Sequence, residues 1–275
     1  MESTEIKRMW YSKFDACCEM VKLLRDKELV FLDKNPTKDY KEKRPTFRYN
    51  KCHHTNYMKL HFDAFHFLET ETYNLYYSLA DLKNLPVMPY KPEYRKTAME
   101  ELNANFDNYL IGYDFLMDID AQDSEHIMDA WNTAKFLKSE VFDKLKLPYT
   151  ILSTNSRGFH FRIRNHYLPH TMKIKSLIKT LNKVAYNIAG IYNLPQIDYS
   201  IVDLRRIALL PFSYNRGYVA IPLSDEEFTF YERERYLAEK WLSVNLANRG
   251  MKERNYGLTD TELRLNVKRF IKEYR

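Results

Sequence analysis

The apolar pattern between residues 110 and 223 limits the possible folds of this chain more than any other feature. Strand patterns occur at 110–121, 149–153, 158–164, 204–212 and 218–223. Two stretches with apolar residues at three- and four-residue steps lie between these runs and predict helices. The order strand, helix, strand, strand, helix, strand, strand predicts an α+β fold, a mixed α/β plan in which two helices cover a sheet.

The two helices of this region have recognisable ends. We expect the first to begin at Ser124 and to end before Pro148, and the second to begin at Thr171 and to end at Gly190. Their predicted buried residues are Ile127, Trp131, Ala134, Leu137, Val141 and Leu145 in the first helix and Ile174, Leu177, Leu181, Val184 and Ile188 in the second. Between the last two strands, the sequence SYNRG (213–217) is typical of a hairpin turn.

Both ends of the chain are predicted to be helical. One amphipathic helix is expected in the first thirty residues, with Met9, Trp10, Phe14, Cys17, Val21 and Leu24 on its apolar face. Near the other end, Ser224 and Glu227 form a capping-box pattern, so we expect the segment 224–275 to be mainly helical.

Composition and targeting signals exclude several classes of protein. With 275 residues, 45% of them hydrophobic, the chain is long enough for one large domain or two small lobes. No signal peptide or run of ~20 apolar residues is present, so we expect a cytoplasmic protein that is neither secreted nor membrane-bound. Three cysteines without a CxxC pair predict no structural zinc, and the histidines that follow Cys52 lack zinc-site spacing. The net charge of +6 permits contact with a polyanion without requiring it.

Two aspartates end the first strand. Asp118 and Asp120 are two residues apart in apolar surroundings, so strand alternation directs both side chains to one face. Two carboxylates buried together repel each other, and a divalent cation relieves that repulsion. Because oxygen ligands suit Mg²⁺ or Mn²⁺, the pair is a candidate metal site. The alternative is a strand that runs into an acidic turn with no ligand, and a DxD pattern alone does not exclude it.

A basic strand follows a turn of small residues. In the strand 158–164, alternation places His160, Arg162 and Arg164 on one face, which we expect to border an open cleft. The preceding turn contains Ser156 and Arg157, whose backbone N–H groups and guanidinium are suited to hold a phosphate. The alternative is an exposed basic face with no ligand and a structural histidine.

A third charged group lies in QIDYSIVDLRR (196–206). It contains Asp198 and Asp203, with Arg205 and Arg206 beside them. Taken alone, these residues are equally typical of a surface ion-pair set, which contributes little stability.

In this order, the three groups resemble the motifs of the archaeal-eukaryotic primase superfamily, which includes the small catalytic subunit of cellular primases and the primase-polymerases. FLMDIDAQD is similar to the family's strand ending in DxD, TNSRGFH to its small-residue turn leading to a histidine, and QID to its downstream aspartate. The likeness covers about residues 67–220. Three short motifs in order are more specific than any one of them.

The resemblance implies a primase-polymerase fold, with an RRM-like catalytic palm packed on an N-terminal α/β lobe. It implies a catalytic domain at 1–223, divided into a lobe at about 1–105 and a palm at 106–223, before the helical segment 224–275. The implied activity is synthesis of primers on a single-stranded DNA template from NTP or dNTP substrates, in the cytoplasm or at a nucleoid or nuclear replication site. Whether a large primase subunit or a helicase is a partner stays open.

The resemblance also implies residue roles. Two Mg²⁺ or Mn²⁺ ions would be held by three aspartates, Asp118, Asp120 and Asp198. The phosphates of the incoming nucleotide would contact Ser156, Arg157 and His160. Nucleic acid would contact Arg162 and Arg164.

The sequence departs from the family pattern at several positions. Asn155 replaces the glycine of the turn, Leu209 replaces a basic residue before Leu-Pro, and Asn215 replaces a histidine. We therefore expect Arg206 and Arg216 to contribute to triphosphate binding. The cysteine-rich zinc knuckle of cellular small subunits is missing from the sequence, which favours a viral, plasmid or diverged-lineage enzyme.

Three other functions are compatible with these residues. The first is a gap-filling repair polymerase of the same superfamily, which would not start synthesis without a primer. The second is an inactive primase-like accessory subunit that only binds nucleic acid. The third is a metal-dependent nuclease that shares only the DxD pattern.

Overall fold

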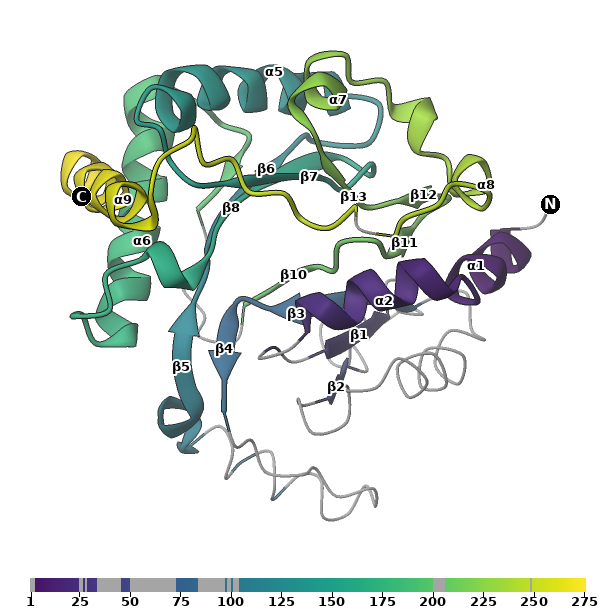
Figure 1. Cartoon of the computed structure of the whole chain (residues 1–275), viewed down its shortest axis with the longest axis horizontal. Coiled ribbons are helices and arrows are strands. Elements are labelled where there is room, and N and C mark those ends of the chain that lie inside the picture. The colour runs from purple at the N-terminus through teal and green to yellow at the C-terminus, as the bar shows by residue number, and fades with distance from the viewer. Residues whose placement is uncertain are drawn as a thin grey trace.

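Two antiparallel sheets organise the chain (Figure 1). The computed structural model describes residues 3–24, 27, 29–33, 46–49, 73–83, 97, 100, 104–199, 206–247 and 249–275. The first sheet has the strand order β10-β3-β1-β2. Its strands are β1 (Leu29–Asp33), β2 (Thr46–Tyr49), β3 (Tyr73–Ser78) and β10 (Ile207–Leu209). Because β10 comes from the palm part of the sequence, the two predicted lobes share a strand. The predicted boundary at 105/106 stays a prediction.

The second sheet has the order β13-β7-β8-β6-β9 and is built by a β-α-β-β-α-β unit. In chain order the unit contains β6 (Phe115–Asp120), α5 (Ile127–Leu137), β7 (Thr150–Ser153), β8 (Gly158–Ile163), α6 (Ile174–Tyr192) and β9 (Ile197–Asp198). A fifth strand, β13 (Ile221–Leu223), pairs with β7 at one edge. The order β7-β8-β6-β9 is that of ferredoxin-like and RRM-like domains. The predicted α+β fold is therefore confirmed, and we call this sheet the palm sheet.

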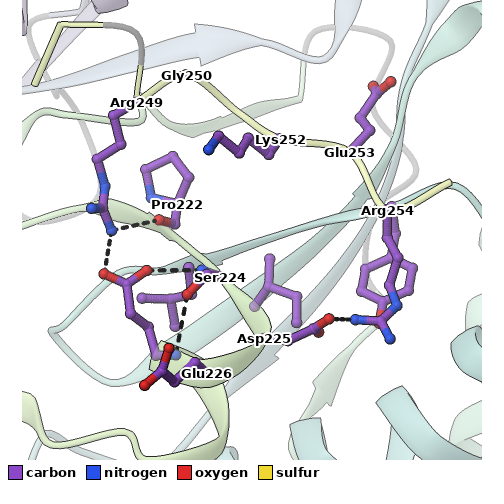
Figure 2. A pocket seen from close by; sticks show the side chains of 13 residues that line it. Pro222, Ser224, Asp225, Glu226, Arg249, Gly250, Lys252, Glu253 and Arg254 are labelled. Carbon is purple, nitrogen blue, oxygen red and sulfur yellow. Dashed lines mark hydrogen bonds and ion pairs between the residues drawn. The ribbon is translucent and has the colours of Figure 1, made fainter. Parts of the chain in front are cut away.

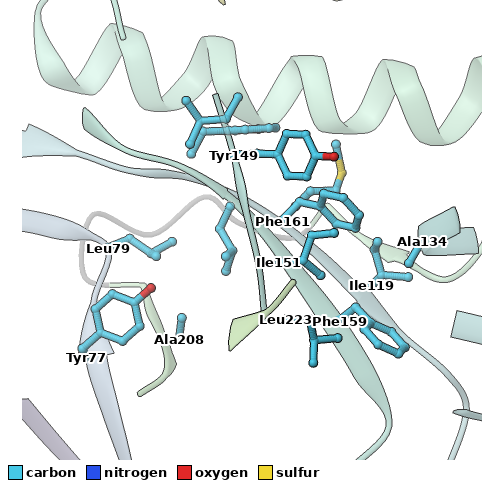
Figure 3. Close-up of a cluster of buried hydrophobic side chains, with 14 of the residues drawn as sticks. Tyr77, Leu79, Ile119, Ala134, Tyr149, Ile151, Phe159, Phe161, Ala208 and Leu223 are labelled. Carbon is cyan, nitrogen blue, oxygen red and sulfur yellow. The ribbon is translucent and has the colours of Figure 1, made fainter. Parts of the chain in front are cut away.

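Apolar side chains on one face of the palm sheet form the core. Met117 lies opposite Phe161, and Ile119 lies opposite Phe159, as strand alternation predicts. All four are fully buried. Figure 3 shows Ile119, Phe159 and Phe161 together with Ala134 of α5. The Phe161 ring also stacks on Phe142, with centroids 4.7 Å apart. Replacing such a buried phenylalanine by alanine typically lowers the free energy of unfolding by about 3–5 kcal/mol. Packing on this apolar face therefore holds the helices against the sheet.

The predicted helices are present, but their ends differ from the prediction. The first begins at Ile127, after Asp123 accepts hydrogen bonds from the N–H groups of Glu125 and His126, so Ser124 is not its cap. The helix continues as a π-helical turn, Lys138–Asp143. The second begins at Ile174, three residues after Thr171.

The second helix also passes Gly190 and ends at Tyr192. The next residue, Asn193, has φ 51 and ψ 56, the left-handed conformation that ends many helices. Asparagine tolerates that conformation better than most residues, so the stop signal was Asn193, not the glycine.

The N-terminal region forms two helices instead of one. They are α1 (Ser3–Tyr11) and α2 (Phe14–Leu23), separated at Ser12 and Lys13. As a result, the predicted apolar face is only partly buried: Trp10, Cys17 and Leu24 are buried, but Phe14 is 61% exposed. Trp10 anchors α1 by donating from Nε1 to the Phe212 carbonyl oxygen at 2.8 Å.

The last quarter of the chain completes the core. Its elements are the hairpin strands β11 (Tyr214–Asn215) and β12 (Tyr218–Val219), then α7 (Asp225–Thr229), a short 3-10 helix (Arg233–Tyr236), α8 (Ala238–Trp241) and α9 (Asp260–Tyr274). The predicted hairpin is confirmed, with positive φ at Arg216 and Gly217. The predicted capping box between Ser224 and Glu227 is also present. No helix of the described residues has the length and apolar character needed to cross a membrane.

A buried ion cluster at Asp114 divides the predicted strand 110–121 in two. Before it, β5 (Leu110–Tyr113) pairs with β4 (Ala80–Leu82); after it, β6 pairs within the palm sheet. Asp114 Oδ2 accepts from Lys27 Nζ at 2.7 Å and from Arg162 Nε at 2.8 Å. Its Oδ1 accepts from the Asn165 N–H at 2.8 Å. Burial alone would raise the pKa of Asp114, but the charges of Arg162 and Lys27 hold it well below its usual range.

We expect Asp114→Asn to lower the free energy of unfolding by about 3–5 kcal/mol, because it leaves the buried charges of Lys27 and Arg162 without their partner. Denaturant unfolding followed by circular dichroism measures the loss. Asp129→Asn is the matched control, because the Asp129 side chain is exposed on α5 and its loss should change little. Equal stability of Asp114→Asn and the unmodified protein would contradict a structural role for the cluster.

The same pair of proteins tests the pKa of Asp114. Because this pKa is lower in the folded than in the unfolded state, the stabilisation is complete above the unfolded value of about 4 and is lost as the pH falls toward the folded pKa. The unmodified protein should therefore lose stability on acidification below about pH 4, and Asp114→Asn should lose less over the same interval.

Candidate active site

Three carboxylates and a histidine meet on the face of the palm sheet that is not covered by α5. In the strand register, Asp118 of β6 lies opposite His160 of β8 on one side and Asp198 of β9 on the other. Asp120 is two residues further along β6, opposite Gly158. Antiparallel neighbours in register point to the same face, so the sequence pattern and the strand order together assemble this cluster.

Basic side chains contact each carboxylate of this cluster. Nε2 of His160 lies 3.3 Å from Oδ1 of Asp118. One terminal nitrogen of Arg206 bridges Asp118 Oδ2 at 3.3 Å and Asp198 Oδ2 at 2.9 Å. A terminal nitrogen of Arg157 lies 2.6 Å from Oδ2 of Asp120. The structure therefore brings Asp118, Asp120, Asp198, Arg157, His160 and Arg206 together.

The electrostatics of the two β6 carboxylates differ. Burial and the negative charge of Asp118 raise the pKa of Asp120, and Arg157 only partly offsets them. Burial would also raise the pKa of Asp118, but His160 and Arg206 outweigh it, so that pKa is lowered. The two adjacent carboxylates therefore have unequal pKa values, as expected when two negative charges lie close together. Additional positive charge, such as a cation, would favour the ionised form of both.

The turn between β7 and β8 is held by buried hydrogen bonds. Asn155 has φ 50, the left-handed conformation in which glycine or asparagine is favoured. Its side chain donates to the Val219 carbonyl oxygen at 2.6 Å and accepts from the Tyr231 hydroxyl at 2.8 Å. Thr154 closes the turn by accepting from the Gly158 N–H at 3.1 Å. In the described structure, the N–H groups of Ser156 and Arg157 have no acceptor within the protein.

Gly158 permits the close contact between this turn and the carboxylates. A Cβ atom at this position would overlap the Ile119 carbonyl oxygen and lie 2.5 Å from Oδ1 of Asp120. Only a residue without a side chain allows β8 to approach β6 at Asp120. The conformation and the glycine together place Arg157 beside Asp120.

Three of the predicted basic residues lie outside the cluster. The expectation that Arg162 borders an open cleft is wrong, because its side chain is 6% exposed and pairs with Asp114. Arg164 lies beyond the end of β8 and contacts Glu253, with its Nε 3.0 Å from Oε1. Arg216 is exposed at the hairpin turn, and no ion pair joins it to the aspartates in the described part of the chain.

Two asparagines at which the sequence departs from the primase-like motifs support the turn. Asn215 donates to the Thr154 carbonyl oxygen at 3.0 Å and, like Asn155, is fully buried. Sequence reasoning treated both only as departures from a motif. Their position beside a Gly-containing turn was the available signal, since asparagine both adopts positive φ and makes several hydrogen bonds. Asp203 and Arg205, and the histidine group after Cys52, lie outside the described residues.

The carboxylate set has the chemistry of a divalent-cation site. Three carboxylates supply the oxygen ligands that Mg²⁺ and Mn²⁺ prefer. Oδ1 of Asp118 is buried, and its 3.3 Å contact with His160 Nε2 lacks hydrogen-bond geometry, which leaves a lone pair available for a cation. As the side chains stand, no three His, Cys, Asp or Glu residues in the described ranges are grouped to hold a metal. Arg206 lies between Asp118 and Asp198, so its guanidinium would have to move before a cation could bind both carboxylates.

A separate cavity of about 490 Å³ lies at the other edge of the palm sheet (Figure 2). β13 and the segment 249–254 line it. Its charged side chains are largely paired with each other: Arg249 with Glu227 at 2.5 Å, and Arg254 with Asp225. These pairs attach the C-terminal segment to β13. β7 and β8 separate β13 from β6, so this cavity is not part of the carboxylate site.

The chain has a distant likeness to a solved polymerase structure. The polymerase domain of ligase D from Mycobacterium tuberculosis, solved in complex with DNA, matches 97% of this chain and 88% of its own with a TM-score of 0.49 and 10% sequence identity. A likeness of this size defines neither fold nor activity, and the α+β fold stands on the strand order described above. No protein-family model matches the chain, and no curated protein is similar to it in sequence.

Proposed function

We propose that this protein is a metal-dependent nucleotidyltransferase that synthesises primers on single-stranded DNA. The observation that carries the proposal is the register of β9, β6 and β8, which places Asp198, Asp118 and His160 side by side on one sheet face. A single DxD pattern is common, but a third carboxylate and a histidine in register with it form a site. The resemblance of the three sequence motifs to the primase superfamily supports the same assignment.

The proposed roles follow from the contacts. Asp118, Asp120 and Asp198 would hold two Mg²⁺ or Mn²⁺ ions, which supply positive charge to the attacking hydroxyl and to the triphosphate. The free N–H groups of Ser156 and Arg157 are oriented by a rigid turn and are suited to donate hydrogen bonds to phosphate oxygens. His160 and Arg157, which now contact Asp118 and Asp120, are within reach of a phosphate bound beside these carboxylates. Arg206 would add positive charge to the same group.

We expect Asp118→Ala to abolish nucleotide incorporation while the protein stays folded. The assay uses a primed single-stranded template, Mn²⁺ and labelled nucleotides, and thermal unfolding verifies the fold. Asp129→Ala is the control, because Asp129 is an exposed aspartate of α5 outside the cluster and should leave incorporation unchanged. Full activity of Asp118→Ala would refute the assignment.

Omitting the primer separates the proposal from its rivals. A primase starts a new chain from free nucleotides without a primer. Assays with NTP alone and with dNTP alone show which sugar it uses. Synthesis only from a primer would identify a gap-filling polymerase. Binding without synthesis would identify an accessory subunit, and release of mononucleotides from DNA would identify a nuclease.

We expect His160→Ala to raise the apparent KM for the nucleotide by roughly tenfold or more, because it removes a charge-assisted contact to phosphate. Steady-state kinetics with varied nucleotide measures this change. His170→Ala is the control, because His170 is an exposed histidine outside the cluster. An unchanged KM and rate would exclude a role for His160 in holding phosphate.

We expect Arg206→Gln to bind Mn²⁺ about tenfold more tightly in the absence of nucleotide, because the guanidinium competes with the cation for Asp118 and Asp198. Electron paramagnetic resonance of free Mn²⁺ measures the affinity without any turnover. Arg235→Gln removes an exposed arginine paired with Glu232 and should not change it. Weaker Mn²⁺ binding by Arg206→Gln would mean instead that Arg206 organises the carboxylates.

A further inference from the structure

Basic and aromatic side chains form a strip along the exposed side of α6 that reaches the palm sheet next to Asp198. We define the α6 strip as Lys175, Lys179, Lys183, Tyr186 and Tyr199, all of which are exposed. Steps of four, four and three residues place the first four on one side of the helix. Tyr199 directly follows Asp198, and its ring lies against Tyr186 with centroids 5.2 Å apart and an interplanar angle of 85°. The strip therefore ends at the β9 edge of the palm sheet, the strand that carries Asp198.

The exposure of the two tyrosines is not a result of loose packing. Tyr186 is 58% exposed and Tyr199 is 48% exposed. The opposite side of α6 is nevertheless well buried, at Leu177, Leu181, Val184 and Ile188. α9 lies beside the helix (Figure 1) and holds its end, since Asn187 donates to the Tyr274 carbonyl oxygen at 2.9 Å. A rigid helix thus presents an aromatic pair to solvent at the edge of the site.

The charged residues of the sequence segment that contains α6 are all basic. No aspartate or glutamate occurs from residue 165 to residue 197, although the whole chain has 37 of them. Lys179 and Lys183 form no ion pair in the described structure. Successive lysines at four-residue steps lie about 6 Å apart along the helix axis. Lys179 and Lys183 therefore place unpaired positive charge on the helix side that ends at the exposed rings.

We propose that the α6 strip binds a single strand of nucleic acid, with its lysines on the phosphates and Tyr186 and Tyr199 stacked on bases. This deepens the proposed function and rests on it, because it gives the strand a path away from the carboxylates around the β9 edge. Single-strand binding sites combine a basic track with aromatic rings that accept any base. A protein partner could also bind the aromatic pair, but it would not require a run of lysines without acidic residues between them.

Fluorescence anisotropy with a labelled oligothymidylate of about 20 nucleotides tests the strip without metal or nucleotide. Tyr186→Ala with Tyr199→Ala should weaken binding by roughly thirtyfold or more, because two stacking contacts are lost. Lys179→Gln with Lys183→Gln should reduce the slope of log K against log salt by about 1.4, because two phosphate contacts are lost. The matched controls are Phe230→Ala, an aromatic that is 64% exposed, and Lys252→Gln at the remote cavity.

The outcomes separate this inference from the proposed function. Binding by the strip variants that equals that of the unmodified protein, or losses no larger than those of the controls, overturns the inference even if incorporation is normal. Equal competition by duplex DNA also overturns it, because paired bases cannot stack on the tyrosines. Weakened binding in the strip variants, with full binding by Asp118→Ala, supports the strip even if the unmodified protein incorporates no nucleotide.

Discussion

The two sheets depend on the buried carboxylate of Asp114. It ends the pairing of β5 with β4 and lets the chain enter the palm sheet as β6 one residue later. Its partners come from both parts of the molecule: Lys27 from the N-terminal part and Arg162 from β8. Removing such charges from water is costly, and the cost is offset only when each group is paired and hydrogen-bonded. The cluster meets that condition, and it therefore specifies how the two sheets are joined.

The position of the candidate site follows from this junction. Arg162 is two residues from His160 on the same face of β8, so the pair with Asp114 also orients the strand that carries the histidine. Arg206 immediately precedes β10, which belongs to the other sheet, and its side chain reaches Asp118 and Asp198. The carboxylates come from the palm sheet, and the arginine that bridges two of them comes from the N-terminal sheet. Nucleotide chemistry at this site would thus depend on both sheets.

Sequence alone predicted the parts of this arrangement that depend on local periodicity. Alternation placed Asp118 and Asp120 on one face of β6 and His160 and Arg162 on one face of β8, and both assignments agree with the register. Positions controlled by distant partners were not predictable in the same way. Arg162 has the pattern of an exposed basic residue, and its burial requires Asp114, which is 48 residues away. The helix ends were misplaced because Asp123 and Asn193 compete with equally plausible caps nearby.

The departures from the primase motifs have a common physical explanation. Asn155 keeps the positive φ that a glycine would adopt and adds buried hydrogen bonds that hold the turn. Leu209 packs in an apolar cluster with Leu152, Ala220 and Tyr76, where a charged residue would be buried without a partner. The positive charge lies instead on Arg206, three residues earlier and in contact with Asp118 and Asp198. The turn conformation and the local charge that the motif residues would supply are thus supplied here by other residues.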